Sequence, residues 1–184
     1  MRLTIEPLAQ LTMEQQQALA WQLQACVAQG ASLGFYQPLS DADVTDYWSQ
    51  VNIELAEKKR LLLGAYVNQL LVASVQLVPC QKQNGRHRGE VEKLLVHPDY
   101  QRQGIAQTLM QGLEIYASQL GIKLLVLDTQ SGDKSEQFYQ AVGFSKSGEI
   151  PHFVSDQQGA LYATSYYYKL LGQSTLASNS SSLS

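Results

Sequence analysis

Apolar side chains recur at helical spacing in two segments of the first third of the chain, after a short alternating stretch. Residues 2–6 alternate in the manner of a β-strand. Thr12 and Gln15 form a capping-box pattern ahead of a first helix, and Gly30 is placed to end it. Asp41 is placed to cap a second helix. The expected buried faces of the two helices consist of Leu19, Leu23, Cys26 and Val27, and of Val44, Tyr47, Trp48, Val51 and Leu55.

The middle of the chain is typical of strands arranged around one amphipathic helix. Two apolar strands at 60–67 and 70–79 are separated by two residues, which predicts an antiparallel hairpin. A further strand ending at 94–96 leads into a helix from Gly104 to about Leu120. The run at 124–127 is continuously apolar, as expected of a strand buried on both faces and parallel to the preceding one. The expected buried face of the helix consists of Ala106, Met110, Leu113, Ala117 and Leu120.

The last third of the chain predicts one short helix and two strands. Asp133 or Ser135 begins the helix, and Gly143 is placed to end it. Strands are expected at about 144–149 and 161–171.

The resulting order is strand, helix, helix, three strands, helix, strand, helix and two strands. This order predicts the α/β class, with a mixed sheet of about seven strands flanked by about four helices rather than a regular alternating fold. We expect one domain at 1–171 and a serine-rich, flexible tail at 172–184.

Composition narrows the classes of protein that fit this pattern. The chain has 184 residues, 45% of them hydrophobic, and a formal net charge of −3, which argues against nucleic-acid binding. No apolar run reaches the roughly 18 residues of a membrane span, and the N-terminus has no signal-peptide core, so we expect a cytoplasmic protein without membrane contact. Cys26 and Cys80 are expected to be free thiols. The three histidines are scattered, so no metal site is expected.

The segment 101–106, Gln-Arg-Gln-Gly-Ile-Ala, carries the strongest functional signal in the chain. It lies where a strand turns into a helix, so backbone N–H groups and the positive end of the helix dipole create an anion site. Neither the Gly-Lys-Ser/Thr phosphate loop nor the three-glycine dinucleotide pattern is present. The site therefore indicates a phosphorylated cofactor of another kind.

In this context the chain resembles the GNAT superfamily of N-acetyltransferases. Their Arg/Gln-x-x-Gly-x-Gly/Ala signature is matched at 101–106, and Pro98 and Tyr100 stand where that family often has them. The resemblance implies a twisted mixed sheet and acetyl-CoA as co-substrate, without a metal. It implies that the turn binds the pyrophosphate and that the preceding strand pairs with the pantetheine arm. The implied cofactor-binding residues are Leu94, Leu95, Val96, Gln101, Arg102, Gln103, Gly104, Ile105 and Ala106.

A narrower resemblance covers residues 127–151. Leu-Asp-Thr-Gln-Ser-Gly-Asp at 127–133, followed by Phe138-Tyr139, Gly143-Phe144 and a Gly-Glu-Ile-Pro run, is similar to the tabtoxin-resistance type of GNAT enzyme. Gln130, Phe138 and Phe144 depart from that pattern. The resemblance implies a small-molecule amine acceptor.

Three residues are candidates for the chemistry of amine acetylation. An alkylamine has a pKa near ~10, so a base must remove a proton, directly or through water. Glu92 is the first candidate for this base and Asp128 the second; Glu92 alternatively pairs with Lys93 or Arg88, and Asp128 alternatively caps the following turn. In the family, a tyrosine at the position of Tyr139 protonates the departing thiolate. The resemblance implies that the N–H of Leu95 or Val96 polarises the acetyl carbonyl.

The acceptor site is placed by the resemblance between the loop at 30–40, the hairpin and the sixth strand. Its candidate residues are Phe35, Tyr36, His152 and Phe153. The Tyr166-Tyr167-Tyr168 run is better explained by core packing. The main hypothesis is an acetyl-CoA-dependent N-acetyltransferase acting on a primary amine of a small molecule in a ternary complex. A protein lysine or N-terminal acetyltransferase and a non-catalytic acyl-CoA-binding module are the alternatives, and both a monomer and a homodimer remain open.

Overall fold

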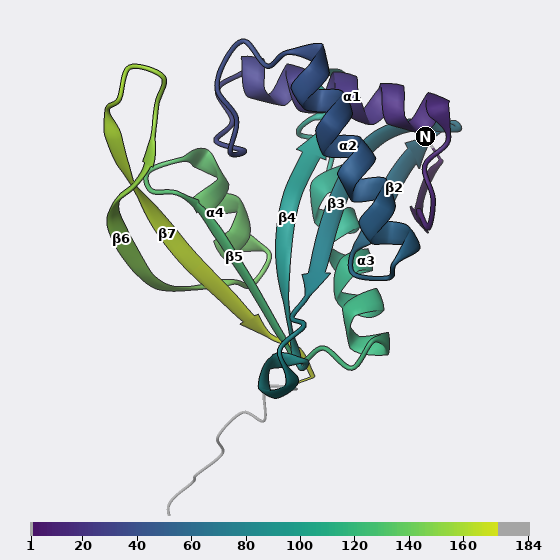
Figure 1. Cartoon of the computed structure of the whole chain (residues 1–184). Helices are drawn as coiled ribbons and strands as arrows, with labels where there is room; N and C mark the ends of the chain where they lie inside the picture. The colour runs from purple at the N-terminus through teal and green to yellow at the C-terminus, as the bar shows by residue number, and fades with distance from the viewer. Residues whose placement is uncertain (1, 173–184) are drawn as a thin grey trace, which may run out of the picture.

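The computed structural model describes residues 2–172, so the predicted tail, apart from its first residue, lies outside the described residues. Seven strands and four α-helices follow one another in the predicted order (Figure 1). The strands are β1 (Leu3–Pro7), β2 (Leu61–Val67), β3 (Leu70–Pro79), β4 (Arg88–Val96), β5 (Leu124–Gln130), β6 (Ser145–Ser155) and β7 (Leu161–Leu170). The helices are α1 (Met13–Ala28), α2 (Asp41–Ala56), α3 (Ile105–Gln119) and α4 (Lys134–Ala141).

All the strands form one mixed sheet in the order β1-β2-β3-β4-β5-β7-β6. Every neighbouring pair is antiparallel except β4 and β5, which are parallel, as the strand–helix–strand unit predicts. The predicted α/β class and mixed sheet are therefore confirmed.

The sheet splits in its middle. β4 pairs with β5 only through Arg88–Glu90 and Leu124–Val126, and the remaining residues of the two strands have no ladder between them. Figure 1 shows the consequence: β4 and β5 meet at the lower end of the molecule and diverge upward. The upper part of β4 therefore has an unpaired edge on its β5 side, while β5 continues its pairing with β7 as far as Gln130.

Two cores hold the helices on opposite faces of β2–β4. α1 and α2 cover one face, where Leu19, Leu23 and Trp48 are buried against Leu62 and Leu95. α3 covers the other face in a second core, which extends under β5 and β7. Neither helix layer covers the front of β5–β7 in Figure 1, so this face of the half-sheet is not covered by a helix.

Local capping follows the predicted signals with one shift. Thr12 and Gln15 make the full capping box at α1, and Asp133 caps α4 by accepting from the N–H of Ser135. The cap of α2 is Ser40, whose hydroxyl accepts from the N–H of Asp43, and Asp41 is the first helical residue. The expectation that Asp41 is the cap was wrong by one position, because both residue types serve as N-caps.

Two burial predictions were also wrong. The buried face of α3 contains Ile105 and Leu109, whereas Leu120 lies outside the helix and is exposed. In β5, Leu125 and Leu127 are buried but Leu124 and Val126 are only partly so. The run 124–127 is apolar although only one of its faces joins the core, and the other face is partly covered.

Candidate functional site

The turn between β4 and α3 presents its backbone to solvent. Gly104 is the N-cap of α3 with φ +79°, and Arg102 has φ +58°, so both have left-handed backbones. A Cβ at Gly104 would meet no atom within 4 Å, so the space in front of the helix N-terminus is open. Gln103 and Gly104 are exposed, whereas the side chain of Ile105 is buried, and only its backbone faces the turn. This geometry fits a pyrophosphate held by backbone N–H groups.

The Gln101 side chain is hydrogen-bonded to other residues of the chain. Its Nε2 donates to the backbone oxygen of Val96 at 3.2 Å and to Oε1 of Gln29 at 3.1 Å. These bonds fasten the turn to the end of β4 and to the end of α1. The motif glutamine is therefore placed to shape the turn, and the exposed Arg102 is the charged side chain available to a phosphate.

The end of β4 offers backbone hydrogen-bonding groups to the splay, which is the region where β4 and β5 diverge beyond their short ladder. The N–H of His97 donates to the Val72 oxygen of β3 at 2.8 Å. Successive N–H groups of a strand point in opposite directions, so the N–H of Val96 points away from β3 and toward the splay, and that of Leu95 points toward β3. Of the two predicted oxyanion donors, this direction favours Val96.

A β-bulge interrupts β4 inside the cleft. Ser74 of β3 pairs with Leu95 but Gln76 pairs with Glu92, so β4 has one extra residue here, and Lys93 has φ +48°. Glu92 faces the α2 side, and Leu95 is buried in the core under α1 and α2. The extra residue lets Lys93 face this same side, where its Nζ lies 5.9 Å from the ring centres of Phe35 and Tyr47. Regular alternation would direct Lys93 into the core under α3. The sequence therefore did not predict that Lys93 faces the α2 side.

Glu92 belongs to a charged network that the sequence did not reveal. Its Oε2 is 2.7 Å from Nη1 of Arg60, and Nε of Arg60 is 2.7 Å from Oε2 of Glu54. Arg60 also donates to Oε1 of Gln76 at 2.5 Å, and Gln76 is hydrogen-bonded to the hydroxyl of Tyr47. Glu92 was expected to pair with Lys93 or Arg88, but its partner is Arg60. Arg60 immediately precedes β2 and is distant in sequence, so no local pattern connects it with Glu92.

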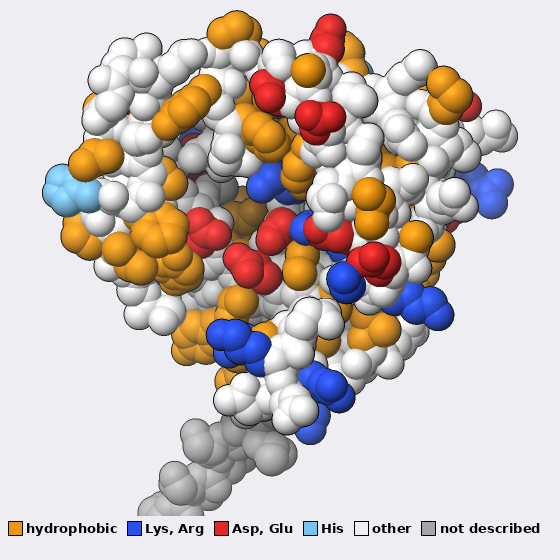
Figure 2. Space-filling model, viewed as in Figure 1, with side chains coloured by type: hydrophobic (Ala, Val, Ile, Leu, Met, Phe, Trp, Pro, Cys, Tyr) orange, Lys and Arg blue, Asp and Glu red, His pale blue; other side chains and the backbone are white. Residues whose placement is uncertain are grey.

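Two further carboxylates face the cleft, Glu90 on β4 and Asp128 on β5. No ion pair or side-chain hydrogen bond involves Asp128 within residues 2–172, so the expected cap of the following turn is not formed. The cleft walls desolvate Asp128 and raise its pKa; the ammonium of Lys93 partly offsets this rise and Glu92 adds to it. Desolvation, with Glu92 and Asp128, also raises the pKa of Glu90. Figure 2 shows acidic side chains gathered around a hollow between the two halves of the sheet.

Tyr139 projects from α4 into the aromatic cluster beneath the splay. Its ring makes edge contacts with Phe138 and Phe144 and is tilted against Tyr167. Burial raises its pKa to about 12, and the charge of Asp128 contributes to the rise. The phenol therefore keeps its proton at neutral pH, as a donor requires.

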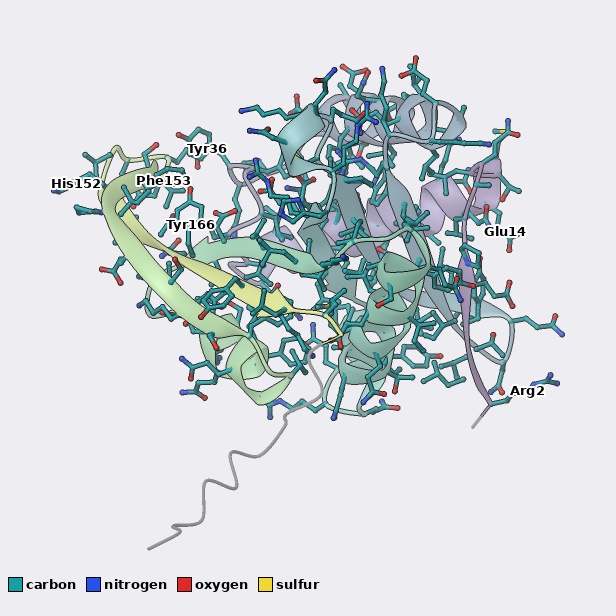
Figure 3. The ribbon with its side chains drawn as sticks, turned by 90° about the horizontal axis from the view of Figure 1, so that it is seen from below. Arg2, Glu14, Tyr36, His152, Phe153 and Tyr166 are labelled. Carbon is teal, nitrogen blue, oxygen red and sulfur yellow. The ribbon has the colours of Figure 1, made fainter. Side chains whose placement is uncertain are left out.

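The four predicted acceptor residues do not lie together: Phe35 lies beside Tyr47, Tyr36 reaches β6, and His152 and Phe153 belong to β6. The hydroxyl of Tyr36 is 2.7 Å from Oγ of Ser155, which connects the α1–α2 loop with the end of β6. Phe153 contacts Tyr166 edge to face, and Figure 3 shows both below the Tyr36 loop. His152 is exposed at the outer edge of β6 in the same view.

The tyrosines of the run 166–168 in β7 point alternately to the two faces of the sheet, as alternation predicts. Tyr167 is buried in the core. Tyr166 is half-buried on the other face, opposite Asp128 in the β5–β7 ladder, and desolvation together with Asp128 raises its pKa. Core packing therefore explains Tyr167, whereas Tyr166 is a cleft residue that the sequence did not single out.

The cleft is open rather than enclosed. Two surface depressions of about 620 and 400 Å³ lie elsewhere, one along β1 and one beside the α1–α2 loop, and none of the predicted site residues lines either. Within residues 2–172, no group of three or more His, Cys, Asp or Glu side chains has the arrangement of a metal site. No helix in this part of the chain is long and apolar enough to span a membrane.

Comparison with known proteins identifies the family of this arrangement. Residues 21–144 match the model of the acetyltransferase (GNAT) family. The ribosomal-protein-alanine N-acetyltransferase of Brucella melitensis is 18% identical, with a TM-score of 0.76 over 91% of this chain and 99% of that one. An N-acetyltransferase of Staphylococcus aureus Mu50 is 13% identical, with a TM-score of 0.75 over 92% and 99%. The yncA protein of Salmonella typhimurium, solved with its cofactor acetyl-CoA, is 16% identical, with a TM-score of 0.73 over 95% and 96%.

Proposed function

This chain belongs to the acetyltransferase (GNAT) family, and we propose that it moves the acetyl group of acetyl-CoA to a primary amine of a small molecule. The observation that carries the proposal is the splay between β4 and β5, with Asp128 and the N–H of Val96 on its two sides. The splay has an unpaired strand edge for an extended pantetheine arm, and it ends at the open N-terminus of α3. A thioester bound along this edge would meet an amine in the acidic cleft.

The transfer is a direct attack within a ternary complex. The amine nitrogen bonds to the acetyl carbon, the C–S bond breaks, and the electron pair of that bond leaves on sulfur. The N–H of Val96 is directed to stabilise the carbonyl oxygen as it becomes negative. Tyr139 donates its proton to the leaving sulfur and regains one from solvent.

The surroundings of the two candidate bases favour Asp128. An oxygen of Glu92 is already engaged by Arg60 at 2.7 Å, so a proton arriving there competes with a guanidinium. Asp128 has no such partner within the described residues, and its raised pKa makes it a better proton acceptor. We therefore assign the base to Asp128, directly or through one water, and assign to Glu92 a role in shaping the charge of the cleft.

A small acceptor is favoured by the bridge over the cleft mouth. The hydrogen bond between Tyr36 and Ser155 joins the α1–α2 loop to the β6–β7 hairpin, so an extended polypeptide would have to separate them. The resemblance of 127–133 to the tabtoxin-resistance type supports the same substrate class.

A panel of acceptors tests this function by the release of free CoA thiol. Amino acids, polyamines and small dipeptides form one arm, and peptides with a free lysine or N-terminus, at least eight residues long, form the other. We expect turnover with small amines above the rate of acetyl-CoA hydrolysis. Turnover with the long peptides alone would replace the proposal by protein acetylation.

A further inference from the structure

Lys93 is a cationic side chain of the cleft that the proposed chemistry does not use. Its ammonium lies 5.9 Å from the ring centres of both Phe35 and Tyr47. Within residues 2–172, no ion pair and no side-chain hydrogen bond involves this ammonium. The lysine is half-buried, and burial lowers its pKa. An unpaired cation removed from water is unfavourable by itself, so an anion that enters the cleft would be attracted to it.

The backbone holds Lys93 in this place at a cost. The bulge gives it a φ of +48°, a region that lysine rarely occupies. The bulge is also what turns the side chain toward α2, instead of leaving it in the α3 core. The strand thus sets the side on which the lysine leaves the sheet, and the rings of Phe35 and Tyr47 lie beside its ammonium.

The other charges of the cleft are arranged around this cation. Arg60 engages Glu92, whereas no ion pair within residues 2–172 involves the other charged groups named in the cleft, which are Lys93, Glu90 and Asp128. Lys93 lies on the α2 side, and Asp128 lies on β5 across the splay. This pattern complements a small molecule with a cationic amine at one end and an anion at the other.

We propose that Lys93 binds a carboxylate of the acceptor, so that the substrates are amines that also carry a carboxylate, as amino acids do. The inference rests on the proposed acetyl transfer and specifies its substrate class. The carboxylate accepts hydrogen bonds from the ammonium of Lys93, and the amine lies toward Asp128. The rings of Phe35 and Tyr47 contact the carbon chain of the acceptor.

Matched acceptors test this assignment. Each α-amino acid of the panel is compared with its amide and with its decarboxylated amine, and kcat/KM is measured from CoA release. For the wild-type enzyme we expect the carboxylate-bearing acceptors to be preferred by about 10-fold or more, since an ion pair shielded from water is lost in the other two.

Three variants connect this preference with Lys93. Lys93→Met removes the ammonium, keeps an unbranched side chain of similar length and has a similar backbone cost. It should lower kcat/KM by about 10-fold to 100-fold for carboxylate-bearing acceptors alone, mainly through KM. Lys93→Arg should retain much of the preference. Lys82→Met removes an exposed lysine from the β3–β4 loop and should leave kcat/KM unchanged for every acceptor. Stabilisation by acetyl-CoA in a thermal unfolding assay shows that each variant is folded.

The outcomes separate the two proposals. If amines with and without a carboxylate are acetylated equally well, the assignment of Lys93 is wrong and acetyl transfer stands. The same holds if Lys93→Met lowers kcat/KM equally for all acceptors. If no small amine of either set is acetylated, the proposed function is wrong, and the assignment of Lys93 is lost with it. If Lys93→Met fails to fold, the preference for carboxylate-bearing acceptors in the wild type and in Lys93→Arg decides whether the assignment of Lys93 holds.

Discussion

The guanidinium of Arg60 lies 2.7 Å from the carboxylate of Glu92 and ties the beginning of β2 to the middle of β4. These strands are not neighbours in the sheet, because β3 separates them. The same guanidinium reaches Glu54 at the end of α2 and the amide of Gln76 on β3. One arginine therefore joins α2, β2, β3 and β4 on the face that forms the cleft.

The Arg60–Glu92 pair should show strong coupling in stability. Arg60→Met leaves two partly buried carboxylates without their partner, and we expect a loss of about 2–3 kcal/mol in the free energy of unfolding. A double-mutant cycle with Glu92→Gln, measured by denaturant unfolding, should give a coupling of about 1 kcal/mol or more. Additive effects would mean that the ion pair contributes little beyond its separate side chains.

Asp128→Asn should remove the proton acceptor of the reaction. We expect kcat to fall about 100-fold to 1000-fold and the acidic limb of the pH–rate profile to disappear. In the wild-type enzyme this limb reflects protonation of the base, so activity falls as the pH drops through the raised pKa of Asp128. The limb should therefore lie above the ordinary Asp range near ~3.9.

Glu92→Gln is the matched comparison for the assignment of the base. It should retain the acidic limb and lose far less turnover, since its effect is on the charge of the cleft. A profile that loses its acidic limb only in Glu92→Gln would return the role of base to Glu92.

Tyr139→Phe should lower kcat by about 10-fold to 100-fold and leave the KM of acetyl-CoA nearly unchanged. The phenol has a pKa of about 12 because it is buried, so it remains protonated up to pH 9. The wild-type enzyme should accordingly show no alkaline limb below pH 10 from this residue. Steady-state kinetics against pH measure both quantities, and wild-type turnover in the variant would exclude Tyr139 as the donor.

Gly104→Val should raise the KM of acetyl-CoA about 10-fold or more. The valine must adopt a φ near +79°, and its side chain would occupy the open space in front of the helix N-terminus. Gly121→Val is the matched control, because Gly121 has a φ of +77° and equally open surroundings, but follows the opposite end of α3. Both variants should lose similar stability in thermal unfolding. An equal rise of KM in both would contradict the placement of the pyrophosphate.

Glu136 should make stability depend on acid pH. Hydrogen bonds from the hydroxyl of Tyr167 and the N–H of Gly132 lower its pKa to about 2, and Lys146 adds to this. A carboxyl whose folded pKa is depressed stabilises the fold above its unfolded pKa, near ~4.3, and this contribution is lost as the pH falls toward 2. Glu136→Gln should lower the Tm by about 2–4 °C at pH 7 and by less at pH 3. An equal change at both pH values would contradict the linkage.

Local signals in the sequence were sufficient for the elements and their order. The capping box of Thr12 and Gln15, the hairpin and the turn before α3 each depend on residues close together in the chain. The 101–106 motif is also a local signal, since a helix N-terminus is built from consecutive residues. Even the parallel pairing of β4 with β5 follows from the helix between them.

The cleft depended on contacts and irregularities that no local pattern records. Lys93 shares a face with Glu92 only because a bulge breaks the alternation of β4, and the sequence around it has no glycine to indicate one. Tyr166 lies in the cleft because β7 places it opposite Asp128. The partner of Glu92 lies 32 residues away in the chain.

The sequence by itself determined the α/β elements and the turn before α3, because periodicity and caps act over a few residues, and the resemblance of 101–106 indicated the family that the comparison shows. Tertiary structure alone decided which charges meet in the cleft: Arg60 engages Glu92, while Asp128 and Lys93 stay free within the described residues. Electrostatic interactions depend on distance in space and on exclusion of water, and neither can be counted along the chain.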